Sequence, residues 1–213
     1  PLSALIGEKA NYVNGNVSRE FDCLWSSSLA DSLTRGKPDN QSVDYSTRIS
    51  GLNEIFDVTT KPIIFDGDNG GEMHHIPYLI KTLERLGTSA IAIEDKIGVK
   101  QNSLFTDQSS SKQDNIKDFC KKIKLIQKTK KSEDFMLIAR IESLIMKKGL
   151  KDALKRAHAY SKAGCDMILI HSKSKDTNEL FKFSNQFKKS KYFIPLVCVP
   201  STYSHVKERD LIK

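Results

Sequence analysis

The sequence of 213 residues contains no long apolar run. A helix that crosses a bilayer needs about 18 consecutive apolar residues, and no stretch of that length is present. No secretory signal peptide is visible either. We therefore expect a cytoplasmic protein with no membrane partner. The chain begins with Pro1 instead of methionine, and we expect it to be part of a longer gene product.

Cysteine is scarce in this chain. The four cysteines lie far apart and form no C-x-x-C pair or zinc-like spacing with histidine. Cys23, Cys165 and Cys198 lie in or beside apolar runs, so we expect these three to be reduced residues of the core.

The sequence also lacks the motifs of several common protein classes. It has no Walker loop, no G-x-G-x-x-G and no nucleophile elbow, so P-loop, dinucleotide-binding and α/β-hydrolase folds have no support in the sequence. Lysine and arginine outnumber aspartate and glutamate by 34 to 26, which gives a net charge of +8. No RNP-like, zinc-finger or helix-turn-helix signature accompanies this charge, so we expect no nucleic-acid partner. Solvated lysine-rich helix faces explain the charge, and a small anionic substrate also fits it.

Apolar, β-branched runs alternate with amphipathic patterns along the chain. The runs predict strands at 22–25, 62–66, 89–95, 136–142, 166–172 and 193–199. Apolar residues spaced by three and four predict helices over 72–86, 115–127 and 150–163. Gly87 and Gly164 follow two of these helices, where C-terminal caps belong. Such alternation predicts a parallel sheet covered by helices.

Polar and charged residues follow five of the predicted strands, and in a barrel of parallel strands these ends meet at one rim. Asp66, Asp68 and Glu94 form an all-oxygen set suited to Mg²⁺. Arg140 and His171, with Lys100 beyond the third strand, supply cationic and hydrogen-bonding groups for a negative substrate. Two alternatives remain: the carboxylates cap helices or pair with lysines, and Arg140 forms an ion pair with Glu94 or Glu142. The residue types favour a magnesium-dependent enzyme acting on a small anionic molecule.

The motif 94-EDKIGVKQNSL-104 resembles the E-D-K-x-G-x-K-x-N-S signature of phosphoenolpyruvate mutases, in the isocitrate lyase/phosphoenolpyruvate mutase superfamily. The resemblance extends in family order to 25-WSSSL-29, 36-GKPD-39, 66-DGD-68, 138-IARIES-143, 151–173 and 199-VPSTY-203. It implies one α/β domain over residues 1–213, a TIM-type (β/α)8 barrel truncated to about six parallel strands. The first and last strands of the barrel would be missing. The full-length protein is expected to be a homo-oligomer.

The resemblance also implies a reaction, the interconversion of phosphoenolpyruvate and phosphonopyruvate with Mg²⁺ as cofactor. It implies a gating loop that closes over the substrate. Gly98 and the serine-rich tail predict that this lid spans 96–114, and an ordinary connection with a solvated lysine is the alternative. The metal ligands would be Asp66, Asp68 and Glu94. The catalytic residues would be Asp39, Lys100, Asn102, Arg140 and His171. The substrate-binding residues would be Trp25, Ser27, Ser28, Leu29, Ser103 and Leu104.

One departure from the family pattern and several alternatives accompany this interpretation. Ser26 and Ser28 stand where many members of the family carry glycine. Phosphonopyruvate hydrolases are close relatives whose loop commonly carries threonine at the position of Asn102, so Asn102 and Gly98 favour the mutase. Lyase relatives carry a catalytic cysteine in this loop, and this loop has none. A non-catalytic phosphate-binding module or an inactive fragment remains as an alternative from a different class.

Overall fold

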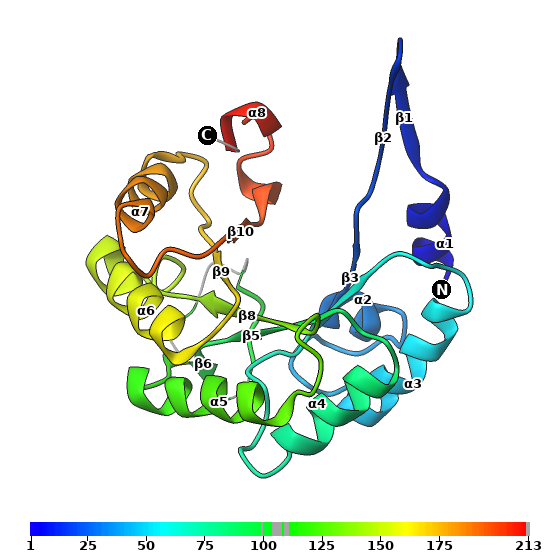
Figure 1. The fold of residues 1–213 in the computed structure, drawn as a ribbon, viewed down its shortest axis with the longest axis horizontal. Helices are drawn as coiled ribbons and strands as arrows, with labels where there is room; N and C mark the ends of the chain where they lie inside the picture. Colours follow the sequence, from blue (N-terminus) through cyan, green and yellow to red (C-terminus); the bar gives the residue numbers. More distant parts are fainter. Residues whose placement is uncertain (99, 104–107, 109–110, 212–213) are drawn as a thin grey trace.

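A curved parallel sheet forms the centre of the molecule (Figure 1). The computed structural model describes residues 1–98, 100–103, 108 and 111–211. Within them, six parallel strands pair in the order β10-β9-β8-β5-β4-β3. Their bounds are Leu24–Ser26 (β3), Ile63–Asp66 (β4), Ala90–Glu94 (β5), Met136–Ile141 (β8), Met167–Ile170 (β9) and Leu196–Cys198 (β10). All six predicted strands are confirmed, and the curled sheet is the expected incomplete (β/α)8 barrel.

Helices cover the outer, convex face of this sheet (Figure 1). Their bounds are Tyr45–Phe56 (α3), Ile76–Arg85 (α4), Ile116–Thr129 (α5), Gly149–Ala163 (α6) and Asn178–Lys188 (α7). A short helix, α2 (Ser28–Leu33), directly follows β3. The three predicted helices are α4, α5 and α6, and they pack side by side in that order. Gly87 (φ +85°) and Gly164 (φ +106°) follow α4 and α6 in the left-handed region, which confirms the predicted caps.

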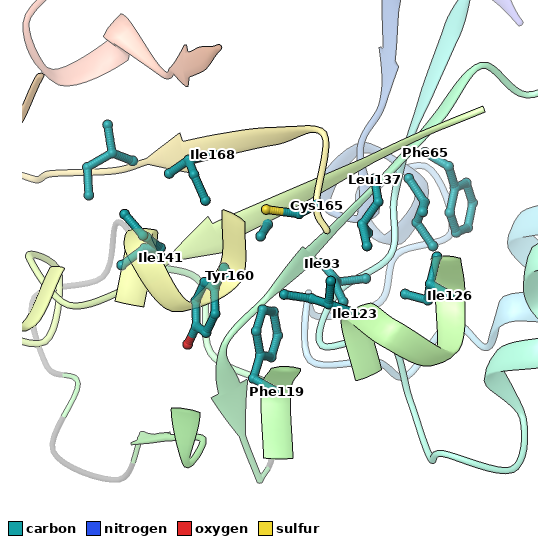
Figure 2. Packing of buried hydrophobic residues seen from close by; sticks show 14 of the residues in the cluster. Phe65, Ile93, Phe119, Ile123, Ile126, Leu137, Ile141, Tyr160, Cys165 and Ile168 are labelled. Atoms are coloured by element: carbon teal, nitrogen blue, oxygen red, sulfur yellow. The ribbon is translucent and has the colours of Figure 1, made fainter. Parts of the chain in front are cut away.

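The helices bury one apolar side against the sheet. Phe119, Ile123 and Ile126 of α5 recur every three or four residues and are fully or almost fully buried. They pack against strand residues such as Ile93 and Leu137, as Figure 2 shows. This face carries the main hydrophobic core.

The inner, concave face of the sheet holds a smaller apolar cluster. Ala90, Ala92, Ile138 and Leu169 are buried there. They alternate along their strands with the outer-face residues, because successive side chains of a strand point to opposite faces. The same two-residue period decides which side of the sheet each residue at a strand end faces.

Several short elements lie outside the predicted pattern. The hairpin of β1 (Asn11–Asn14) and β2 (Val17–Glu20) projects away from the sheet, and all eight of its strand residues are exposed (Figure 1). The others are α1 (Leu2–Lys9), β6 (Lys96–Ile97), β7 (Lys112–Gln113), a 3₁₀ turn (Pro200–Thr202) and α8 (Glu208–Leu211). None of the described helices is long and apolar enough to cross a membrane.

The cysteine prediction is correct for one residue of three. Cys165 is buried, whereas Cys23 and Cys198 are exposed. Cys23 directly precedes β3 and Cys198 ends β10, and these are the two edge strands of the sheet. An edge strand lacks a neighbour on one side, so an apolar run there is incompletely covered. All four cysteines are free thiols.

We predict that Ile123→Ala lowers the free energy of unfolding by about 2–5 kcal/mol, because Ile123 is fully buried between α5 and the sheet. Lys124→Ala on the neighbouring, exposed position of α5 is the control. It should change stability by no more than about 0.5 kcal/mol. Urea unfolding followed by circular dichroism measures both. Equal effects of the two substitutions would contradict the assignment of this helix face.

Candidate active site

The two-residue period of the strands brings four predicted site residues to the inner face. Asp66 follows Ile64, Glu94 follows Ala92, Arg140 follows Ile138 and His171 follows Leu169, each by two positions. All four stand at or just beyond the C-terminal ends of parallel strands, which are in register: Glu94 pairs with Arg140, and Arg140 pairs with Leu169. The expected convergence at one rim is therefore present.

A cavity of about 380 Å³ opens at this rim. The predicted site residues that line it are Trp25, Ser27, Ser28, Leu29, Asp39, Asp66, Glu94, Lys100, Asn102, Ser103, Arg140 and His171. Asp68 is buried beside it and borders a neighbouring cavity. Leu104 lies outside the described residues, as does part of the expected gating loop. Lys100, Asn102 and Ser103, which belong to that loop, lie at the cavity, and its gating role stays a prediction.

Lys100 connects three parts of the site. Its ammonium group donates to Asp39 Oδ1 at 2.7 Å and contacts Ser28 Oγ and Asp68 Oδ1. Ser28 Oγ in turn donates to Asp66 Oδ2 at 3.0 Å. Burial alone would lower the pKa of Lys100, but the negative charges of Asp66 and Asp68 outweigh it and raise that pKa. The lysine is therefore held in its charged form.

Arg48 is a second cation that contacts Asp68. Arg48 of α3 is almost fully buried; its Nη1 lies 3.2 Å from Asp68 Oδ2 and its Nε lies 2.9 Å from Asp31 Oδ2. The guanidinium carbon lies 4.4 Å from the centre of the Phe65 ring. Arg48 thus compensates buried negative charge without lining the cavity.

A separate ionic cluster surrounds Glu94 and Glu142. Arg140 Nε lies 2.5 Å from Glu142 Oε1 and 3.7 Å from Glu94 Oε2. Lys96 Nζ lies 3.7 Å from both glutamates and donates to Ser103 Oγ at 2.8 Å. Ser103 Oγ donates to Glu142 Oε2 at 2.7 Å. The ion pairs considered as an alternative for Arg140 are present, within a cluster that also holds the loop residue Ser103.

The carboxylates of the site respond differently to this environment. Burial raises the pKa of Glu94 to about 7, with a further contribution from the charge of Glu142. Burial and the neighbouring charge of Asp66 raise the pKa of Asp68. The pKa of Asp66 is lowered, because Lys100 and Arg48 outweigh the effect of its burial. Burial therefore raises the pKa of two of the three predicted metal ligands, although cations lie beside both.

The oxygen-only donor set of Asp66, Asp68 and Glu94 fits a hard divalent cation. The segment is compact, since Glu94 N donates to Asp68 O at 2.7 Å and Asp68 N donates to Asp66 Oδ1 at 3.1 Å. Among the described residues, however, no three His, Cys, Asp or Glu side chains are grouped closely enough to hold a metal ion. The assignment of Mg²⁺ to Asp66, Asp68 and Glu94 stays a prediction.

His171 presents a hydrogen-bond donor to the site. Its Nδ1 lies 3.2 Å from Arg140 Nη2, and because arginine only donates, Nδ1 is the acceptor. The proton of the neutral ring is then on Nε2, a buried atom with no hydrogen-bond partner among the described residues. Burial and the positive charge of Arg140 lower the pKa of His171 to about 4. The imidazole is therefore neutral at pH 7.

The remaining predicted residues lie at the end of β3, in the first turn of α2 and in the loop. Ser27 caps α2, since its side chain accepts from Ala30 N, and this places Ser28 and Leu29 in the first turn. Asn102 Nδ2 lies 3.5 Å from Asp39 Oδ2. Trp25 is about one-third exposed and supplies apolar surface to the cavity.

Comparison with known proteins agrees with this geometry. The phosphoenolpyruvate phosphomutase family model matches residues 1–213. The chain belongs to the phosphoenolpyruvate phosphomutase family. It is 37% identical over 206 residues to a phosphoenolpyruvate phosphomutase of Tetrahymena pyriformis, an alignment that covers 95% of this chain and 67% of that protein. It is 33% identical over 212 residues to a phosphonopyruvate hydrolase of Variovorax sp. (strain Pal2), which covers 99% and 69%.

Solved structures of the same family have the same fold. A phosphoenolpyruvate phosphomutase from Streptomyces platensis subsp. rosaceus superposes with a TM-score of 0.83 at 31% identity, covering 90% of this chain and 65% of that one. A phosphonopyruvate hydrolase in complex with oxalate and Mg²⁺ gives 0.83 at 32%, covering 99% and 68%. The chain spans about two thirds of the length of these relatives. Mutases and a hydrolase are similar to it at comparable identity.

Sequence reasoning missed Arg48 and Lys96, and it considered Glu142 only as an ion-pair partner of Arg140. Arg48 stands in a helix that no apolar periodicity had indicated, and its carboxylate partners are 17 and 20 positions away. Lys96 and Glu142 stand inside recognised motifs, and their position at strand ends was the available signal. Their contacts with Ser103 give them a role in placing the loop.

The low pKa of His171 predicts a pH effect on stability. The unfolded chain binds a proton at the ordinary histidine pKa near 6.5, whereas the folded protein does not until about pH 4. This contribution is therefore complete above the unfolded pKa and is lost as the pH falls toward 4. Between pH 7 and pH 5 the free energy of unfolding should fall by about 2 kcal/mol more in the unaltered protein than in the His171→Asn variant. Urea unfolding at both pH values gives the difference, and identical pH dependence of the two proteins would refute the assignment.

Proposed function

We propose that this protein is a phosphoenolpyruvate mutase that interconverts phosphoenolpyruvate and phosphonopyruvate, the step that forms the carbon–phosphorus bond of phosphonates. The observation that carries the proposal is the position of the loop residues Lys100 and Asn102, which lie with Asp39 at the cavity beside Asp66. We also propose that the enzyme acts in the cytoplasm and that the full-length protein is a homo-oligomer.

The cavity suits a small molecule with a carboxylate and a phosphoryl group. Arg140 supplies a partly buried guanidinium and His171 a neutral Nε2–H, which together would stabilise negative charge on the phosphoryl oxygens. The backbone amides of Ser27, Ser28 and Leu29, beside Trp25, are assigned to the substrate carboxylate. Ser103 and Leu104 are assigned to the same substrate from the side of the loop.

Mg²⁺ is the proposed cofactor, held by Asp66, Asp68 and Glu94. The support is the donor chemistry, the raised pKa of Asp68 and Glu94, and the Mg²⁺ bound together with oxalate by the related hydrolase. When bound, the ion would offset the negative charge of a substrate such as phosphoenolpyruvate. Arg48 and Arg140 supply positive charge on two sides of this set.

The reaction is an intramolecular phosphoryl transfer that needs no co-reactant. The bond between phosphorus and the enol oxygen breaks, and a bond from phosphorus to the methylene carbon forms. Asp39 orients the phosphoryl group or momentarily accepts it, while Lys100 and Asn102 follow it from the loop. Such a loose transition state is stabilised by positioning and charge. Water has to be kept out, because it would capture the phosphoryl group and release phosphate.

The second candidate is a phosphonopyruvate hydrolase, favoured by the 33% identity to the Variovorax enzyme over nearly the whole chain. The hydrolase would use the same carboxylates and the same cations. Gly98 and Asn102 in the loop favour the mutase. The two functions differ only in where the phosphoryl group goes, so a product assay separates them.

Phosphorus NMR of the protein with phosphonopyruvate and Mg²⁺ tests the proposal. A mutase should produce phosphoenolpyruvate, and a hydrolase should produce inorganic phosphate. Prolonged chelation should abolish the reaction, and Mg²⁺ should restore it. Arg140→Ala should lower kcat at least ~10²-fold, as the loss of a charge-stabilising donor does. Full activity without Mg²⁺, or a near-normal rate in Arg140→Ala, would argue against the assigned roles.

Asn102→Thr gives the loop the residue common in hydrolases and tests the role of Asn102 separately. If Asn102 guides the phosphoryl group from oxygen to carbon, this variant should form phosphoenolpyruvate more slowly, and the remaining turnover should shift toward pyruvate and phosphate. Gln101→Thr on the neighbouring loop position is the control. An unchanged mutase rate with no released phosphate would refute the role of Asn102.

A further inference from the structure

Glu94 and Asp95 are adjacent, but their side chains serve opposite sides of the sheet. Glu94 lines the cavity, whereas Asp95 extends toward the helix layer, as the alternation of strand residues requires. Asp95 is completely buried, and it does not line the cavity. The proposed reaction therefore gives the Asp95 carboxylate no direct role, although Asp95 stands between β5 and the loop.

Four donors from three parts of the chain converge on the Asp95 carboxylate. Oδ1 accepts from Glu142 N at 3.0 Å. Oδ2 accepts from Tyr160 OH at 2.7 Å, from Gln113 Nε2 at 2.9 Å and from Arg156 Nη1 at 3.1 Å. Tyr160 and Arg156 belong to α6 and are buried themselves. Such convergence fixes the carboxylate in one position.

Asp95 and Arg156 also hold together the two ends of the loop over 96–114. The loop leaves the sheet directly after Asp95 and returns at Asp114. Asp114 N donates to Asp95 O at 2.7 Å, and Arg156 Nη1 donates to Asp114 O at 2.9 Å. One buried arginine and one buried aspartate therefore hold the departing and the returning arm together.

The cluster is also joined to the groups that face the cavity. Asp95 N donates to Arg140 O at 3.1 Å, and Asp95 Oδ1 holds the backbone of Glu142. The Glu142 side chain accepts from Arg140 Nε and from Ser103 Oγ. A displacement of Asp95 would move Arg140 and the loop relative to each other.

We propose that Asp95, Arg156 and Tyr160 form a loop clamp, a set of positioning residues that fixes where the loop meets the cavity and so keeps water from the phosphoryl group. This inference rests on the proposed function, and it adds a control of product partition from the helix layer. None of the three touches the substrate. Their loss would act through Arg140, Glu142 and the two arms of the loop.

Two conservative substitutions test the loop clamp. Tyr160→Phe removes one donor to Asp95, and Arg156→Lys keeps the charge but loses the planar fork. Tyr78→Phe and Arg85→Lys on α4 are matched controls at exposed positions. With phosphonopyruvate and Mg²⁺, phosphorus NMR should show the ratio of phosphate to phosphoenolpyruvate rising at least about fivefold in the loop-clamp variants, the factor carried by one hydrogen bond. This ratio does not depend on the fraction of folded enzyme.

Hydrogen exchange provides a second readout that needs no activity. The amides of Asp114 and Glu142 donate to Asp95 and should exchange faster in Tyr160→Phe and Arg156→Lys than in the unaltered protein and the controls. Unchanged exchange at both amides would overturn the loop clamp. Faster exchange with an unchanged product ratio would overturn its role in excluding water. If the unaltered protein makes no phosphoenolpyruvate, the proposed function fails, and the exchange data still decide whether the loop clamp exists.

Discussion

The candidate site depends on the compensation of buried negative charge. Asp66, Asp68 and Glu94 are withdrawn from water at neighbouring strand ends, and a buried carboxylate is costly unless a cation or a hydrogen-bond donor faces it. The compensating cations are Arg48, Lys96, Lys100 and Arg140. They come from a helix, from a strand and from the loop, so the charge balance requires all of these elements to be in place at once. The ionic network is therefore what defines the geometry of the cavity.

The alternation of strand residues divides the work at each strand end. Ala92 and Ile138 belong to the inner apolar cluster. Two positions further along the same strands stand Glu94 and Arg140, which line the cavity. The residue between two such positions faces the helices, and Asp95 is the example with polar contacts. Of two adjacent residues, Glu94 therefore lines the cavity, and Asp95 binds side chains of the helix layer. A shift of one residue in the register would exchange these roles.

Most of the sheet and its rim could be predicted from the sequence, because both rest on local patterns. Apolar runs of β-branched residues fixed the six strands, and apolar spacing of three and four fixed α4, α5 and α6. The convergence of Asp66, Glu94, Arg140 and His171 followed from the parallel arrangement alone. These features need no knowledge of which distant residues meet.

The rest depended on contacts between distant residues. Arg48 and Arg156 look like ordinary helix arginines in the sequence, and only the fold brings them to Asp68 and Asp95. The exposure of Cys23 and Cys198 follows from the edges of the sheet, which a local apolar run does not reveal. The hairpin of β1 and β2 has no buried face in the described residues, so it lacks the alternation by which strands are recognised.

Arginine and lysine occupy different parts of the candidate site. Arg48, Arg140 and Arg156, in α3, β8 and α6, each bind two or more acceptors through a planar guanidinium. A planar fork donates in set directions, so these contacts hold the carboxylates at fixed angles. The loop and its base carry Lys96 and Lys100 instead. A lysine ammonium group has three donors that can rotate, and it stands on a flexible stem. In the proposed reaction, a cation that follows the phosphoryl group would use this freedom, whereas the groups that orient it would stay fixed. The arginines of the site therefore stand in its sheet and helices, and the lysines stand at the loop and its base.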